Sequence, residues 1–161
     1  DRASLVAALQ GDIDVVVNIV GASGLLEARA VVDLYSVAAS NLTSALKQAG
    51  IARIVSVSSG GVAPQPNDGW FYTHVLKRFF LEPMYADMRR MEAVLAASGL
   101  RSTVVRPPYL VGGAVTGGYR TSIDAPLPDD GSLRRADLAH FLLRVVEQPE
   151  PWEGHWVAIS E

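Results

Sequence analysis

Two stretches of small and hydroxyl-bearing residues are placed where they could take part in chemistry. Gly21-Ala22-Ser23-Gly24 follows an apolar run and precedes a helical pattern, which is the setting of a phosphate-binding turn. A dinucleotide fingerprint needs three glycines and an Asp or Glu about 20 residues further along the chain. This turn has two glycines, and the next apolar run ends in Ser58-Ser59 without an acid. We therefore favour a strand end of small residues that lets a flat group approach over a primary phosphate loop.

Ser58-Ser59 is the second stretch. If the preceding run is a buried strand, these hydroxyls lie at its mouth, and one of them faces whatever fills the cleft. Serine pairs are also ordinary turn residues, and Ser59 has no evident base to activate it as a nucleophile. The histidines, His74, His140 and His155, have no triad context, and their spacing matches no zinc pattern. We therefore predict no metal site.

A rigid pair, Pro107-Pro108, follows the apolar run Thr103–Val105. Each proline lacks a backbone donor and fixes φ, which predicts a stiff turn that could also act as a wall for a planar ring. Met84, Met88 and Met91 form a stripe at helical spacing. Such a stripe is typical of a core, although flexible methionines can also line an adaptable pocket.

Elements of two alternating kinds must position these residues. The β-branched runs Val15–Val20, Ile51–Val57 and Leu100–Val105 predict buried parallel strands, with a closing strand at His155–Ile159. Helical periodicity predicts a first helix ending at Gly11, one over Glu27–Gln48, one through the methionine stripe and one around Leu138–Val145. We expect loops at Gly60–Gly69 and Gly112–Gly131, the latter with a short strand around Tyr119–Thr121. This order predicts an α/β fold with a mostly parallel sheet, helices on both faces, and strand ends that meet at one cleft.

Length and composition limit the classes of protein that fit. The 161 residues suit one domain, residues 1–161, and 49% are hydrophobic. The formal net charge of −3 argues against a nucleic-acid surface, and the pairs Arg89-Arg90 and Arg134-Arg135 are predicted to be solvated at helix ends. There is no cysteine, no leader and no apolar run of about 20 residues. We therefore predict a cytoplasmic protein with no membrane partner.

Several segments together resemble a known family, the atypical short-chain dehydrogenase/reductases. The closest group is the NAD(P)H-binding proteins that include biliverdin-IXβ/flavin reductase and the NmrA-like regulators. The segments that carry the resemblance are Val15–Gly21, Asn41-Leu42, Ile54–Gly60, Tyr85–Glu92, Leu95–Leu100, Thr103–Pro108, Thr116-Gly117, Tyr119-Arg120 and Arg135–Ala139. The resemblance implies a Rossmann-type fold with the cofactor across the carboxyl ends of the strands.

Carried over by position, the resemblance also implies site residues. Val20, Gly21 and Ala22 would pass beside the ribose and pyrophosphate of NADP or NAD, with NADP slightly preferred. Ser58 and Ser59 would lie on the nicotinamide side, and Pro107, Pro108 and Tyr109 would wall the nicotinamide pocket. The substrate would enter over the two loops.

The first departure from the family concerns the front of the fold. The family begins with a strand, a glycine-rich turn, a helix and a strand, and this chain shows no such segment before its first helix. A βαβ unit takes about 30 residues or more, so the domain is expected to be N-terminally incomplete. The strand at residues 15–20 would then be an open edge, which predicts a homodimer or another association through that edge.

The second departure concerns proton transfer. Better-known short-chain dehydrogenases use a Tyr followed four residues later by a Lys, which lowers the pKa of the tyrosine. Here Tyr85 is followed by Arg89, and the family positions fall one residue earlier, on Met84 and Met88. One residue is a rotation of about 100° on a helix. Tyr85 and Ser59 are therefore weak catalytic candidates, and the proton would come from solvent or substrate.

Three functions stay open at this point. The first is an NAD(P)H-dependent oxidoreductase acting on a planar or quinone/flavin-like acceptor, in which the cofactor supplies the chemistry. The second is a non-catalytic NAD(P) sensor of the NmrA-like type. The third is a fragment that cannot bind nucleotide, because the turn that would hold the pyrophosphate is not in the sequence.

Overall fold

The computed structural model describes residues 2–22, 33–63, 81–128 and 131–161. Its main sheet has five strands in the order β1-β2-β3-β7-β5. Their bounds are β1 Val16–Asn18, β2 Arg53–Val57, β3 Arg101–Arg106, β7 Trp156–Ser160 and β5 Arg120–Ile123. The strands β1, β2, β3 and β7 are parallel to one another, and β5 pairs antiparallel with β7. The predicted mostly parallel α/β fold is confirmed.

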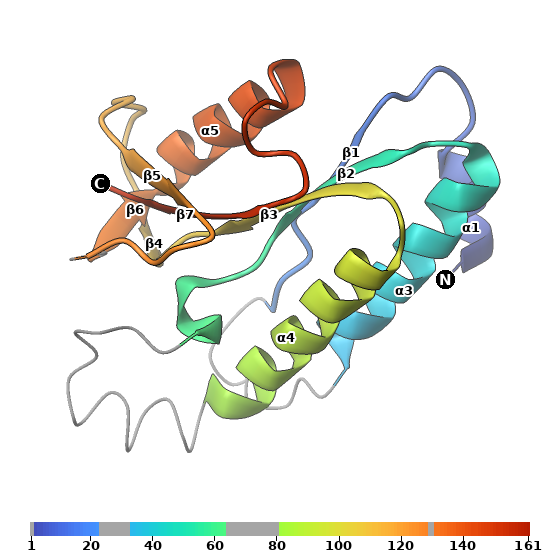
Figure 1. Cartoon of the computed structure of the whole chain (residues 1–161), viewed down its shortest axis with the longest axis horizontal. Helices are drawn as coiled ribbons and strands as arrows, with labels where there is room; N and C mark the ends of the chain where they lie inside the picture. The colour runs from blue at the N-terminus through green and yellow to red at the C-terminus, as the bar shows by residue number, and fades with distance from the viewer. Residues whose placement is uncertain (1, 23–32, 64–80, 129–130) are drawn as a thin grey trace.

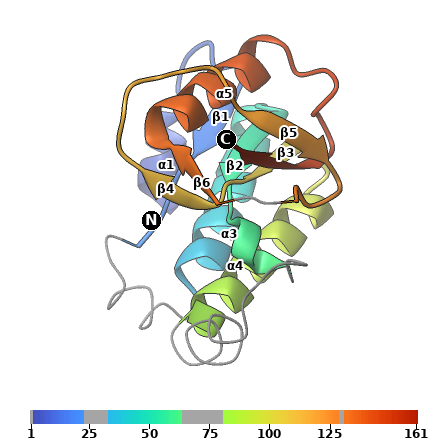
Figure 2. The same ribbon diagram turned by 90° about the vertical axis from the view of Figure 1, so that its left-hand side faces the viewer.

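Helices cover both faces of this sheet. Those described are α1 Arg2–Ala8, α3 Leu34–Ala49, α4 Glu82–Ala97 and α5 Arg135–Glu147, with a 3-10 turn, η1, at Gly60–Val62. Figure 1 shows α5 above the sheet, with α3 and α4 side by side below it. Figure 2 shows the same three layers after a quarter turn.

Strand alternation divides the interior into two cores. Ile54 and Val104 face the helices α3 and α4, in a cluster with Leu46, Met91 and Leu95. The next residue in each strand, Val55 or Val105, faces α5 in a second cluster with Phe141 and Trp152. Continuous β-branched runs are what a sheet buried on both faces requires, which explains why the sequence showed runs rather than alternation. Met88 and Met91 are buried in the first cluster, so the methionine stripe is core.

Several boundaries differ from those predicted. β1 covers three residues, not Val15–Val20, because it pairs only with β2 in the described part of the chain, from Val16–Ile54 to Asn18–Ser56. The helix expected over Glu27–Gln48 is described from Leu34 onward, and residues 27–32 lie outside the described ranges. The other strands and helices are confirmed to within a few residues.

A small parallel pair of strands is an addition that the sequence did not reveal. β4 Tyr109–Val111 pairs with β6 Ser132–Arg134 across a connection that contains β5. Each strand has only three residues, too few for a hydrophobic pattern to register. The first strand of the pair, β4, begins directly after Pro107-Pro108.

Beside β1 lies an apolar groove of about 790 Å³. Residues of α1, β1 and the first half of α3 line it, including Leu5, Val16, Leu34 and Leu42. Within the described ranges no strand pairs with the outer edge of β1. The large side chains left exposed along this edge are Val17, Ile19, Val20, Leu34 and Val37.

Candidate functional site

The three strand ends singled out in the sequence do lie beside one another. The parallel register of β1, β2 and β3 brings Asn18, Val57 and Arg106 to the same edge of the sheet. Two backbone bonds join the second and third ends: the N–H of Ser58 donates to the carbonyl of Val105, and that of Gly60 to Pro107, each at 2.8 Å. The ends of β2 and β3 are therefore held together beyond the strands themselves.

The end of β1 is shaped by a buried amide, that of Asn18. Its Nδ2 donates to Ser56 Oγ at 3.0 Å, and its Oδ1 accepts from the N–H of Val20 at 3.2 Å. The second bond turns the chain at Val20. A further bond, from the N–H of Ala22 to the Tyr35 hydroxyl at 3.3 Å, attaches the following residues to α3.

Asp87 of α4 caps α3 from outside that helix. Its carboxylate accepts from the N–H groups of Tyr35 and Ser36, at 2.7 and 3.4 Å, and from the Ser36 hydroxyl at 2.5 Å. The sequence neighbour at the N-cap position, Asp33, makes no such bond. Because the first N–H groups of a helix need acceptors, the fully buried Asp87 replaces the local cap.

Glu92 lies about one and a half turns further along α4 and holds the ends of β2 and β3. Its Oε1 accepts from the Ser58 hydroxyl at 2.6 Å and from Arg106 Nε at 3.0 Å, and Oε2 accepts from Arg106 Nη2 at 2.5 Å. The guanidinium of Arg106 also stacks over the Trp156 ring, 4.0 Å from its centroid. The Arg106–Glu92 pair is bidentate, stacked and mostly buried. Contacts of this kind are geometrically specific, because both groups are planar and must be aligned.

Tyr85 and Arg89 both contact the turn after β2. A Cβ atom at Gly61 would lie 2.4 Å from the Tyr85 hydroxyl oxygen, so only glycine leaves room for this ring. Arg89 Nη1 donates to the carbonyl of Val62 at 3.1 Å, and its Nη2 pairs with Glu82. Tyr85 is only 5% exposed. The structure therefore places Tyr85 beneath the turn that carries Ser59, with Arg89 holding the same turn.

The other predicted residues differ in how open they are. Val20 and Gly21 are exposed, Pro107 is buried, and Tyr109 is 77% exposed. Ser59 is half-buried, and its Oγ accepts from the N–H of Gly61 at 3.3 Å. Ser58 is buried, and its hydroxyl turns to Glu92 rather than to the cleft. Among these predicted residues, Val20, Gly21 and Tyr109 are exposed, Ala22, Ser59 and Pro108 are half-buried, and Ser58 and Pro107 are buried.

These residues combine an open stretch of backbone with rigid prolines. Gly21 has no atom closer than 4.0 Å to an added Cβ, so a flat group can approach its backbone. The prolines supply a rigid apolar border. The described residues supply no second glycine-rich turn that would cradle a pyrophosphate, and residues 23–32 lie outside the described ranges.

The histidines are placed away from these strand ends where they are described. His155 Nδ1 lies 2.6 Å from Asp124 Oδ2, before the start of β7, and His140 Nδ1 lies 2.8 Å from the Tyr119 hydroxyl. His74 lies outside the described ranges. Among the residues that the structure describes, no three His, Cys, Asp or Glu side chains form a group that could hold a metal ion. No helix in those ranges is both long and apolar enough to cross a bilayer.

Sequence reasoning missed the carboxylates that organise this edge. Asp87 and Glu92 stand in a helix beside Arg89-Arg90, where acidic residues usually mean a solvated face. The signal that could have found them is that each carboxylate stands four residues from a core methionine, Asp87 from Met91 and Glu92 from Met88, so both border the buried face of the helix. Arg134 was also misjudged: it is half-buried and pairs with Glu161 at 3.0 Å, so it is not a solvated helix end.

A parallel sheet with helices on both faces and small residues at adjoining strand ends defines a Rossmann-type domain. A family described as NAD(P)H-binding matches residues 1–149. The chain belongs to this NAD(P)H-binding family.

Solved structures agree with this fold. A Rossmann-fold NAD(P)-binding family protein from Shigella flexneri is 20% identical, with a TM-score of 0.72, and all of this chain covers 66% of that one. A short-chain dehydrogenase/reductase from Veillonella parvula in complex with NADP is 17% identical, with a TM-score of 0.77, and all of this chain covers 68% of it. An anaerobilin reductase from Escherichia coli O157:H7 is 21% identical, with a TM-score of 0.74, and all of this chain covers 71% of it. The chain thus spans about two thirds of the length of these proteins.

Proposed function

We propose that this protein is a cytoplasmic NAD(P)H-dependent oxidoreductase that acts on a planar or quinone/flavin-like acceptor. The observation that carries the proposal is the attachment of the ends of β2 and β3 to Glu92 of α4, beside the rigid segment Pro107-Pro108. Membership of the NAD(P)H-binding family supports the cofactor class. The anaerobilin reductase and the NADP complex among the similar structures support a reductase and a slight preference for NADP.

The proposed cofactor contacts are residues at the ends of the three strands, some exposed and some buried. Val20, Gly21 and Ala22 lie beside the ribose and pyrophosphate, and Ser58 and Ser59 lie on the nicotinamide side. Pro107, Pro108 and Tyr109 border the ring. When bound, the nicotinamide supplies a hydride to the acceptor. The chain's own contribution is to hold the two reactants in register and to exclude water at the border.

Proton supply is the part of the reaction that these residues support least. Tyr85 is buried beneath Gly61, and Arg89 is directed to Val62 and Glu82 rather than to the tyrosine hydroxyl in the described contacts. Ser59 is the hydroxyl with the better access. We therefore propose that solvent or the acceptor itself supplies the proton, with Ser59 aiding orientation.

The experiment uses the full-length protein. NADPH and NADH binding are followed by nicotinamide fluorescence, and oxidation at 340 nm is followed with FMN and menadione as acceptors. Binding with turnover supports the proposal. Tight binding without turnover of any acceptor would favour an NAD(P) sensor, and the absence of binding would favour an interaction module.

We also propose that the open edge of β1 associates with a further strand. The support is the exposed apolar row of Val17, Ile19 and Val20 beside the groove. An apolar edge with unpaired backbone groups is a template for strand pairing. A homodimer of the 161-residue chain is the form in which this association is tested below.

A further inference from the structure

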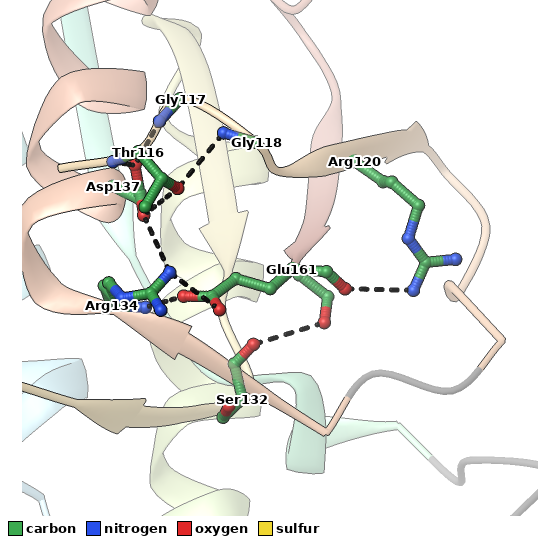
Figure 3. Close-up of polar contacts among 9 residues, drawn as sticks. Thr116, Gly117, Gly118, Arg120, Ser132, Arg134, Asp137 and Glu161 are labelled. Carbon is green, nitrogen blue, oxygen red and sulfur yellow. Dashed lines mark hydrogen bonds and ion pairs between the residues drawn. The ribbon is translucent and has the colours of Figure 1, made fainter. Parts of the chain in front are cut away.

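The segment that follows the proline border is a loop held by one buried carboxylate. Residues 112–118 leave the end of β4 and are exposed to solvent without forming helix or strand. Asp137, in the first turn of α5, is fully buried beneath them. Figure 3 shows its carboxylate directed at Thr116 and Gly117.

Three hydrogen bonds make this attachment. Asp137 Oδ1 accepts from the N–H groups of Thr116 and Gly117 at 2.8 and 2.7 Å, and Oδ2 accepts from the Thr116 hydroxyl at 2.9 Å. The same hydroxyl oxygen accepts from the N–H of Gly118 at 3.2 Å. The loop backbone is therefore fixed over three consecutive residues.

Arg134 supports the loop from below. A Cβ atom at Gly113 would lie 2.8 Å from Cδ of Arg134, so the glycine lets the loop rest on this side chain. Arg134 Nη1 lies 4.0 Å from Asp137 Oδ2 and 3.0 Å from Glu161 Oε2. Gly113 and Gly117 both have positive φ, 134° and 71°, which fits a loop built for one shape.

Holding an exposed loop this firmly adds little to the core, because its side chains bury little apolar surface. Val115, in the middle of the loop, is 55% exposed. A fixed, exposed, apolar surface is what a binding site needs, since a preorganised wall costs less entropy when a ligand arrives. The loop also continues from Pro107-Pro108 through the short strand β4, so border and loop are one segment.

We propose that Asp137 is a positioning residue that holds loop 112–118 as the acceptor-side wall of the cleft. This inference rests on the proposed function and adds the part of the chain that meets the acceptor. Val115 contacts a flat apolar acceptor, and Asp137 acts only through the loop. The cofactor contacts at Val20–Ala22 do not depend on it.

The test compares Asp137→Asn with Asp124→Asn in the full-length protein. Asn at Asp137 presents an amide group to backbone N–H donors and loses the charge. Asp124 also uses its carboxylate for two contacts, with the N–H of Trp156 and with His155, but it lies at the other end of β7. Asn tolerates the positive φ of Asp124, 52°, so this control keeps its backbone.

Two readouts separate positioning from general stability. For Asp137→Asn, we expect the KM for menadione to rise about tenfold, with kcat and the NADPH dissociation constant within about twofold of wild type. Amide hydrogen exchange at Thr116 and Gly117 should become faster. Thr116→Ser should behave as wild type, and Thr116→Val should share part of the KM effect. Asp124→Asn should leave both readouts unchanged.

An unchanged KM, or unchanged exchange in the loop, would overturn the inference. The inference would also be overturned if Asp137→Asn and Asp124→Asn raised KM, lowered kcat and weakened NADPH binding to the same extent. Such equal effects would indicate a general structural role. If the wild-type protein shows no turnover at all, the proposed function fails and the acceptor role fails with it. Exchange in the loop still decides, by itself, whether Asp137 positions these residues.

Discussion

The Ser58 hydroxyl donates to Glu92 Oε1 at 2.6 Å, and this bond attaches the end of β2 to the middle of α4. The same carboxylate pairs with Arg106 at the end of β3. Asp87 of the same helix caps α3, so α4 supports the ends of two strands and the start of a neighbouring helix. This edge of the sheet is therefore held by polar contacts from one helix as well as by the pairing of the strands.

Replacing Glu92 should be costly because it leaves Arg106 without its carboxylate. For Glu92→Gln, we expect a loss of about 3 kcal/mol in the free energy of unfolding, measured by urea denaturation. Glu147→Gln, at an exposed carboxylate near the end of α5, is the control and should change stability by about 0.5 kcal/mol or less. Equal effects in the two variants would refute a special role for Glu92.

The capping of α3 can be tested by comparing Asp87 with Asp33, because both carboxylates belong to the start of that helix. Asp87→Asn should lower the free energy of unfolding by about 2 kcal/mol, because buried N–H groups lose a charged acceptor. Asp33 occupies the local N-cap position without a side-chain bond, so Asp33→Asn should be nearly neutral. A larger loss for Asp33→Asn, measured by thermal or urea unfolding, would contradict the capping of α3 from α4.

The catalytic candidates can be judged by the size of their effects. If the proton comes from solvent or acceptor, Ser59→Ala and Tyr85→Phe should each lower kcat by less than about tenfold in the NADPH oxidation assay. A positioned general acid is worth about a hundredfold or more. A loss of that size for either variant would make that residue the proton donor.

The edge of β1 predicts association of the 161-residue chain. We expect light scattering to show a dimer or larger species, and Val17→Lys with Ile19→Lys to shift it to the monomer, because a lysine on an edge strand opposes pairing. Leu143→Lys replaces an equally exposed apolar residue on α5, and it should leave the association unchanged. A monomeric wild-type chain would rule out pairing through this edge.

The loop anchor also predicts a pH dependence. Burial raises the pKa of Asp137, but bonds from Gly117 and Thr116 and the charge of Arg134 outweigh it and bring the pKa below 3.8. Because the folded state binds its proton less readily than the unfolded chain, the stabilisation is complete above about pH 4 and is lost as the pH falls through the folded pKa.

The measurement is the difference in unfolding free energy between wild type and Asp137→Asn from pH 7 to pH 3. The difference should be constant down to about pH 5 and should narrow below about pH 4. If the difference in unfolding free energy widened as the pH fell, the result would contradict the lowered pKa of Asp137.

The sequence was enough to predict the fold because the sheet is buried on both faces. Runs such as Ile51–Val57 have few other structural explanations, and the small residues after them marked the strand ends. The contacts that shape the site could not be predicted in the same way. Tyr35 and Asp87 are 52 residues apart, and no local pattern pairs them.

Short elements were the other failure, because β4 and β6 have three residues each and are joined through a long connection. The sequence showed Thr116-Gly117 and Arg135–Ala139 only as parts of a family resemblance. The structure shows why they occur together: the carboxylate from the second segment holds the backbone of the first. A contact of this kind is invisible until the fold brings the two segments into register.

Asp87 and Glu92 are five residues apart on a single rigid helix, which is a rise of about 7.5 Å. Through these two carboxylates, one rigid helix holds both the start of α3 and the ends of β2 and β3. Loop 112–118 is attached instead to α5, through Asp137. The sequence of that loop could therefore change without disturbing any of the attachments to α4.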